Sequence, residues 1–197
     1  CPVLNSSGRW DSAMTFDGSN DSINVNITTS GIFGNNFSIS SWAKTLAWDE
    51  ERTIFGGWRN VGGSLYFEIS FEQYNQKFEA IVHEGSNSNI VDSSSTYTND
   101  GGWHNLVLTI DESGRIRGFY IDGILQGSNT TYSPDISSLD ILRIGDWPSD
   151  TIGAAPWNGT IDEVMVFDKV LSASDVAFLY NSTIYRYQAG ANNEYNI

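Results

Sequence analysis

The fold is decided by the stretch Trp157-Asn158-Gly159-Thr160-Ile161-Asp162-Glu163-Val164-Met165-Val166-Phe167. A polar turn built on Asn158 and Gly159 leads into a strand whose apolar residues occupy both side-chain phases. Strands that are apolar on both faces lie inside layered β-structure. Asp162 stands at the entrance of this strand, and a carboxylate in such a place needs a cation or a set of hydrogen-bond donors beside it. The stretch therefore predicts an inner strand that holds a partnered carboxylate.

Short strands separated by turn signals follow along the rest of the chain. Residues 64–72 alternate cleanly between apolar and polar side chains, Asp122-Gly123 is a strong two-residue hairpin signal, and Gly56-Gly57 is expected to end a strand. This pattern predicts an all-β fold, a two-sheet antiparallel jelly-roll sandwich. The predicted strands are 13–16, 22–27, 37–44, 53–55, 64–72, 77–82, 103–110, 117–121, 124–126, 142–144 and 160–167.

One short helix is predicted near the C-terminus, at residues 172–181. Ser172 is expected to be its N-cap, and Asp175 is the acid at the third helical position. The length of 197 residues suits a single β-domain. We therefore predict one domain at 1–183, followed by a C-terminal extension or linker at 184–197.

The formal net charge of −14 limits the classes of partner. An anionic surface repels nucleic acid and anionic membranes, so neither is expected as a partner. No apolar run is long enough to cross a bilayer, so membrane insertion is not expected either. Cys1 is the single cysteine and leaves three readings open: a lipidated terminus, a disulfide to other sequence, or an unpaired thiol. A start at cysteine rather than methionine predicts a mature form or an excised fragment.

Asn-x-Ser/Thr sequons suggest an exported, glycosylated protein, because seven of them occur in 197 residues. Two of the seven, at Asn36 and Asn158, abut predicted strands and are the poorest acceptors. The predicted glycosylation sites are Asn5, Asn20, Asn26, Asn129 and Asn181.

Four segments, taken in order, resemble the laminin-G-like family of concanavalin A-like jelly rolls, and a short helix follows them as in that family. The resemblance covers roughly residues 8–182 and is specific for the fold rather than for a function, because the fold hosts lectins, adhesion modules and spacers. The segments are Phe16-Asp17-Gly18-Ser19-Asn20-Asp21-Ser22-Ile23; Phe37-Ser38-Ile39-Ser40-Ser41-Trp42; Gly102-Trp103-His104-Asn105-Leu106-Val107-Leu108-Thr109 with Tyr120-Ile121-Asp122-Gly123; and Arg143-Ile144-Gly145 with Asn158-Gly159-Thr160-Ile161-Asp162-Glu163-Val164.

The resemblance implies a structural Ca²⁺ where the first hairpin meets the last core strand. The matching positions are Asp17, Gly18, Asp21 and Asp162. Backbone carbonyls and carboxylates of this kind suit Ca²⁺, which takes six to eight oxygen ligands. The alternative is that the two turn aspartates form Asx turns and that Asp162 is hydrogen-bonded to the backbone.

Catalysis is not expected. Related glycoside hydrolases carry a Glu-x-Asp-x-x-Glu triplet, which is absent here. Glu68 and Glu72 share a face of one predicted strand but lie about 13 Å apart, too far to flank one glycosidic bond. The two histidines do not form a catalytic pair, and His104 is expected to be a framework residue. Cys1 has no plausible base beside it.

Tryptophans in predicted loops are the remaining candidates for a binding site, because loops of a sandwich are where binding concentrates. Trp147 is the first choice, since Pro148 stiffens its segment and Asp146 and Asp150 can accept bonds from sugar hydroxyls or hold a bridging Ca²⁺. Trp48 and Trp58 are second choices. The alternative is that these side chains cap the ends of the sandwich.

The sequence thus predicts an extracellular or cell-surface module of a larger protein or assembly. We expect it to bind a glycan or a surface protein, with a carbohydrate-binding or adhesion role and a structural calcium. The alternative is a structural spacer or filament subunit that has no ligand of its own.

Overall fold

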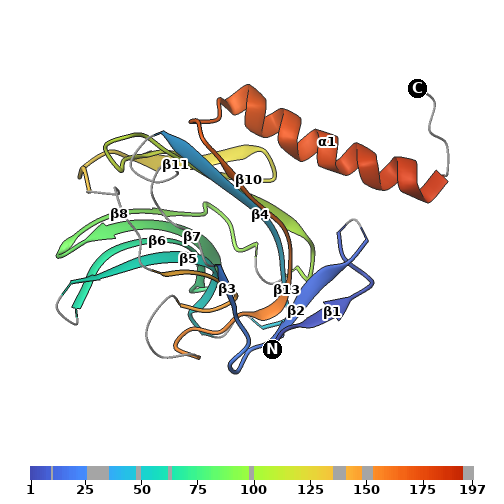
Figure 1. Cartoon of the computed structure of the whole chain (residues 1–197). Helices are drawn as coiled ribbons and strands as arrows, with labels where there is room; N and C mark the ends of the chain where they lie inside the picture. Colours follow the sequence, from blue (N-terminus) through green and yellow to red (C-terminus); the bar gives the residue numbers. More distant parts are fainter. Residues whose placement is uncertain are drawn as a thin grey trace.

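The computed structural model describes residues 1–9, 11–25, 36–47, 50–61, 64–97, 100–134, 141–147 and 153–192, with only the main chain described at 59–61, 64–70, 72, 141 and 183–192. Two antiparallel sheets of seven and six strands pack face to face, and one helix lies outside them (Figure 1). The predicted all-β jelly-roll sandwich is confirmed.

The seven-stranded sheet contains the decisive stretch as β13 (Asn158–Phe167), which lies between β2 and β4. Its place inside the sheet confirms the predicted inner strand. The order of the strands is β1 (Val3–Asn5), β2 (Ala13–Asp17), β13, β4 (Phe37–Thr45), β9 (His104–Ile110), β10 (Ile116–Ile121) and β11 (Ile124–Asn129).

The six-stranded sheet shows where sequence reasoning was wrong. Its order is β3 (Ile23–Val25), β12 (Ile141–Ile144), β5 (Arg52–Val61), β6 (Ser64–Tyr74), β7 (Lys77–Glu84) and β8 (Asn87–Asp92). The strand predicted to end at Gly56-Gly57 instead continues to Val61. Gly57 is paired with Leu142 on one side and Ile69 on the other, so two ladders hold the glycines extended. The short strands β1 and β8 were not predicted.

The core between the sheets is aromatic and aliphatic. Phe71 of β6 stacks on Phe119 of β10 with ring centroids 6.1 Å apart, so this pair joins the two sheets. Trp157 is fully buried in the same cluster. The alternation predicted for 64–72 holds at Phe71, which faces the core.

The β10–β11 hairpin confirms the predicted Asp122-Gly123 turn. Both residues have positive φ, 53° and 78°, as a two-residue type I′ turn requires. A Cβ on Gly123 would lie 3.6 Å from the Cβ of Tyr180, so this turn also touches the helix.

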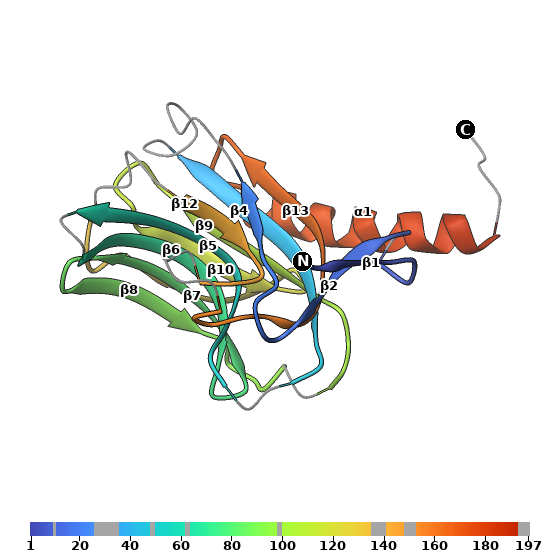
Figure 2. The same ribbon diagram turned by 60° about the horizontal axis from the view of Figure 1, so that its bottom comes forward.

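The helix α1 (Ala173–Asn192) covers the outer face of the seven-stranded sheet (Figure 1). Its predicted cap is confirmed, because Ser172 Oγ accepts the Asp175 N–H while the Asp175 carboxylate accepts the Ser172 N–H. Val176 packs on Val107 and Tyr120. The predicted end at residue 181 was too early: no helix breaker occurs before Gly190, and the helix continues past the sheet edge near β1 (Figure 2).

Candidate functional site

The outer face of the six-stranded sheet carries the predicted binding residue Trp58 and also Arg143, which bonds to the backbone of a second one, Trp147. Leu142 belongs to the core, so the alternate residue Arg143 points outward from β12. Trp58 of β5 lies opposite Ile141 and is therefore on the same outer face. Trp58 lies within a strand, so its predicted place in a loop was wrong.

Arg143 connects this face to the loop that follows β12. The residue is only 5 % exposed. The Nε donates to Asn24 Oδ1 on β3 at 2.8 Å, and Nη1 donates to the carbonyl of Trp147 at 2.8 Å. These two bonds fix the position of Trp147 relative to the sheet. We call the side chains of Asn24, Trp58, Arg143 and Trp147 the Trp147 surface.

Asp146 organises the loop that carries Trp147. Its carboxylate is fully buried and accepts the N–H groups of Trp147 at 2.9 Å, Gly153 at 2.7 Å and Ala155 at 3.1 Å. Arg143 Nη1 lies 3.8 Å from the same carboxylate. The prediction that Asp146 accepts bonds from sugar hydroxyls is therefore wrong, because its oxygens are turned inward and occupied by the backbone.

The two tryptophans of this surface differ in exposure. Trp147 is half-buried, whereas Trp58 is 6 % exposed and its indole N–H has no hydrogen-bond partner among the described residues. Of the two, Trp147 is thus the ring that a ligand can reach. The other predicted members, Trp48 and Asp150, lie outside the described residues.

Sequence reasoning missed Arg143 and Asn24. A signal for Arg143 was present, because it stands between Leu142 and Ile144 in an apolar strand. A cation there needs acceptors beside it. Nothing in the sequence indicated which acceptors these would be, since Asn24 is 119 residues away.

The four predicted calcium ligands do not form one site. Asp17 is paired with Asn158 on β13, whereas Asp162 lies four residues further along that strand, which corresponds to about 13 Å. Asp162 instead accepts the N–H groups of Arg9 at 2.8 Å and Glu163 at 2.9 Å, which is the alternative that the sequence left open. Among the described residues, no group of three or more His, Cys, Asp and Glu side chains is placed to hold a metal.

The first turn keeps the rest of the predicted calcium set together. Asp21 is 4 % exposed and accepts the Asp17 N–H at 3.1 Å, and its other oxygen lies 2.7 Å from the amino group of Cys1. Asp17 accepts the Ser19 N–H at 2.8 Å, and Gly18 takes a φ of 77°. These contacts are those of an Asx turn with one buried carboxylate.

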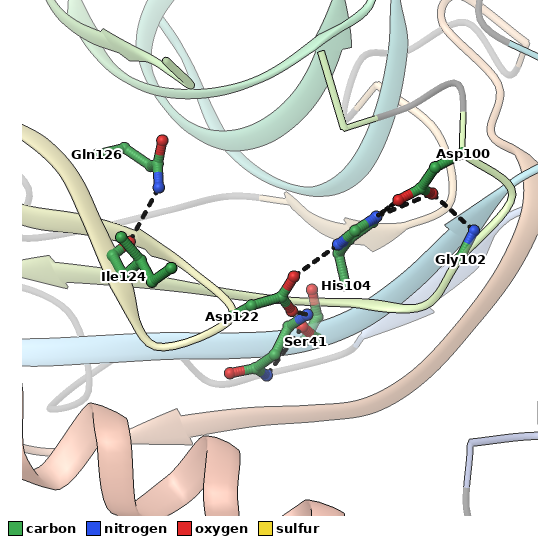
Figure 3. A network of polar contacts seen from close by, with 8 residues as sticks. Ser41, Asp100, Gly102, His104, Asp122, Ile124 and Gln126 are labelled. Carbon is green, nitrogen blue, oxygen red and sulfur yellow. Dashed lines mark hydrogen bonds and ion pairs between the residues drawn. The ribbon is translucent and has the colours of Figure 1, made fainter. Parts of the chain in front are cut away.

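A second polar cluster is centred on His104, which is only 7 % exposed. Its Nδ1 lies 2.7 Å from Asp122, and its Nε2 lies 3.1 Å from Asp100 (Figure 3). Burial lowers the pKa of His104, but the hydrogen bonds and charges of the two carboxylates raise it by more, so it lies above the usual 6.5. The cluster holds the loop at Asp100 and the turn at Asp122 together, which is the framework role predicted for His104.

The predicted glycosylation sites differ in accessibility. Asn20 and Asn181 are exposed. The amide of Asn5 donates to Thr15 Oγ1 and that of Asn129 donates to the carbonyl of Ile90. Asn26 lies outside the described residues. Attachment of a glycan at these positions stays a prediction.

Comparison with known proteins agrees with the fold. Residues 17–177 match the family model of the concanavalin A-like lectin/glucanases superfamily. No curated protein sequence matches the chain.

Solved structures with the same fold include carbohydrate-binding domains. Domain 4 of AbnA, an extracellular GH43 arabinanase from Geobacillus stearothermophilus in complex with arabinotriose, is similar with a TM-score of 0.70 at 20 % identity, over 91 % of this chain and 81 % of that one. The CBM40 of the Ruminococcus gnavus IT-sialidase, bound to α2,3-sialyllactose, gives a TM-score of 0.65 at 14 % identity, over 82 % and 99 %. The binding domain of botulinum neurotoxin serotype D gives 0.68 at 22 % identity, over 92 % and 44 %.

Proposed function

Because the chain belongs to the concanavalin A-like lectin/glucanases superfamily, we propose that it is a carbohydrate-binding module that acts outside the cell or at its surface. The arabinanase domain and the CBM40 support a glycan as the class of ligand, since both are described with an oligosaccharide bound. No helix among the described residues is long and apolar enough to cross a membrane.

The Trp147 surface is the observation that carries this proposal. Trp147 is half-buried, and its backbone is fixed by hydrogen bonds to Asp146 and Arg143. Sugars stack their apolar faces on such rings, and a residue whose backbone is already fixed loses little entropy on binding. The net charge of −14 disfavours anionic glycans, so we infer a neutral oligosaccharide as the ligand.

A glycan array followed by calorimetry tests the proposal. On the oligosaccharide that the array identifies, Trp147→Ala should weaken binding about thirtyfold, as for a typical hot-spot aromatic. Trp103 is also half-buried but precedes β9, outside the Trp147 surface, so Trp103→Ala is the matched control. A melting curve for each variant separates loss of binding from loss of folding. Equal affinity of Trp147→Ala and the wild type would remove this surface from the proposal.

The alternative role, a spacer or filament subunit, predicts a different result from the same array. No glycan would bind, and the chain would form ordered assemblies in solution. An adhesion role within a larger surface protein fits the same proposal and would appear as binding to a glycoprotein rather than to a free sugar.

A structural calcium is proposed only for the turn that contains Asp17 and Asp21. Ca²⁺ should then raise the melting temperature of the wild type, because a ligand that binds only the folded state stabilises it. Asp21→Asn should abolish this rise and Asp162→Asn should not. A rise that depends on Asp162 instead would contradict the separation of the two carboxylates along β13.

A further inference from the structure

On one of its two sides, β13 is paired with a neighbouring strand along only part of its length. On one side, β4 pairs with β13 as far as Phe167. On the other side, β2 pairs only with residues 158–161 of β13. Among the described residues, no strand pairs with 164–167 on the β2 side. Within the part of the chain that the structure describes, a strand position in the middle of the seven-stranded sheet is therefore vacant along half its length.

The path of the chain explains this vacancy. β2 begins at Ala13, opposite the middle of β13, where a strand continuing it would run beside residues 164–167. Instead, the Gly8 N–H donates to the Asp11 carbonyl, and β1 pairs with β2 on the side away from β13. The turn lies against Asp162, which accepts the Arg9 N–H.

The side chain of Val166, next to the vacancy, is more exposed to solvent than its orientation toward the core would predict. Val166 is opposite Ile39, a core residue that is 0 % exposed, and so it faces the core side of the sheet. Nevertheless, Val166 is 39 % exposed. A bulge lies just before it, between Asp162 and Met165, where Glu163 has a φ of 49°. Bulges of this kind redirect side chains at functional sites.

An apolar cleft of about 200 Å³ opens beside residues 161–164 of β13, where the pairing with β2 ends, and Val164 is the one residue that belongs both to its lining and to the unpaired half. Its walls come from both sheets, and the carboxyl-bearing residues Asp162 and Glu163 line it as well. The opposite side of the sandwich is bridged instead, because Asn129 donates to the Ile90 carbonyl and Gln126 accepts from Ser94. The apolar lining of the cleft includes Met14, Phe16, Ile23, Ile144, Ile161 and Val164.

We propose that an extended segment of a partner polypeptide adds as a β-strand beside residues 164–167 of β13. Backbone hydrogen bonds along the vacant edge would supply binding energy, and alternate apolar side chains would enter the cleft. The net charge of −14 selects a segment whose remaining side chains are basic. This binding activity is separate from the glycan site, which lies on the outer face of the other sheet.

The probe is a short peptide, acetylated and amidated, that alternates valine with lysine. We expect saturable binding to the full chain, with slower hydrogen exchange at the amides of residues 164–167. The same peptide, N-methylated at alternate residues, keeps its apolar side chains but cannot complete the ladder, and it should not bind. Binding of both peptides alike would overturn the proposal, as would the absence of binding by either one.

Two variants localise the interaction. Val166→Lys places a positive charge at the vacant position, where it repels the lysines of the peptide, and should weaken peptide binding about tenfold. Leu125→Lys, at another exposed apolar residue on β11, should leave affinity unchanged. Melting curves confirm that both variants are folded. Dimerisation of the chain, lost in Val166→Lys, would show that a second copy fills the edge and would contradict a separate partner.

Discussion

Gln73 is the residue whose surroundings differ most from what its chemistry demands. It lies next to the C-terminal end of β6 and is 0 % exposed. Neither its amide oxygen nor its amide nitrogen has a hydrogen-bond partner among the described residues. By contrast, the buried Asn105 donates to Ser40 Oγ at 3.1 Å. A buried amide without partners loses its bonds to water and gains nothing in return.

Replacement of Gln73 by methionine should therefore stabilise the protein. Methionine has a similar volume and no polar group to desolvate, so the free energy of unfolding should rise by about 1–3 kcal/mol. Denaturant titration measures this change. Asn105→Leu is the contrasting variant: it removes an amide whose nitrogen donates to Ser40 Oγ and to the Ser41 carbonyl, so it should destabilise. A loss of stability in Gln73→Met would show that the amide is satisfied in solution.

At the scale of elements, the His104 cluster joins the loop at Asp100 to the β10–β11 turn. Carboxylates lie at both ring nitrogens, and only the protonated imidazole can donate to both. Partial burial raises the pKa of Asp100, but the Gly102 N–H and His104 lower it by more, so it lies below the usual 3.8.

The stability that the His104 cluster provides should depend on pH in a defined direction. The His104 contribution, whose pKa is raised, is complete below pH 6.5 and is lost as the pH rises through the folded value. The Asp100 contribution is complete above pH 3.8 and is lost as the pH falls through its folded value. The difference in unfolding free energy between wild type and His104→Gln should therefore be largest between these limits. A difference that grows above pH 8 would contradict a protonated His104 that donates to both carboxylates.

Attachment of α1 to the sheet depends on a stack of three side chains. Tyr180 lies over Trp42 with ring centroids 5.7 Å apart, and the Arg9 guanidinium lies 4.4 Å from the centroid of the Trp42 ring. Tyr180→Ala removes one layer and should lower the free energy of unfolding by about 1–2 kcal/mol. Phe178 on the same helix is 74 % exposed, so Phe178→Ala should change it by less than about 0.5 kcal/mol. Equal effects of the two substitutions would place the helix elsewhere.

At the scale of the whole molecule, the net negative charge destabilises the compact folded state. Acidic residues number 24 against ten basic ones. Self-repulsion of this kind weakens as salt shortens the distance over which charges interact. The melting temperature should therefore rise between about 10 mM and 300 mM NaCl, where the screening length falls below about 10 Å. A melting temperature that falls with salt would show that attractive pairs outweigh the repulsion.

The sequence by itself determined the features that depend on neighbours along the chain. Alternating side chains mark strands, Asp122-Gly123 specifies a turn with two positive φ angles, and Ser172 with Asp175 caps a helix within one turn. These interactions span a few residues, so their signals stand side by side in the sequence.

Strand register decided the rest, because only pairing in space determines which distant residues meet. Pairing with β12 keeps Gly56 and Gly57 within β5. The arrangement of the strands also places Arg143 beside Asn24 and Trp147, and it separates Asp162 from the turn at Asp17. It also turned Asp146 inward as the anchor of its loop. The fold could thus be predicted from local patterns, whereas the candidate site depends on contacts between residues up to 119 positions apart, for which the sequence carries no local signal.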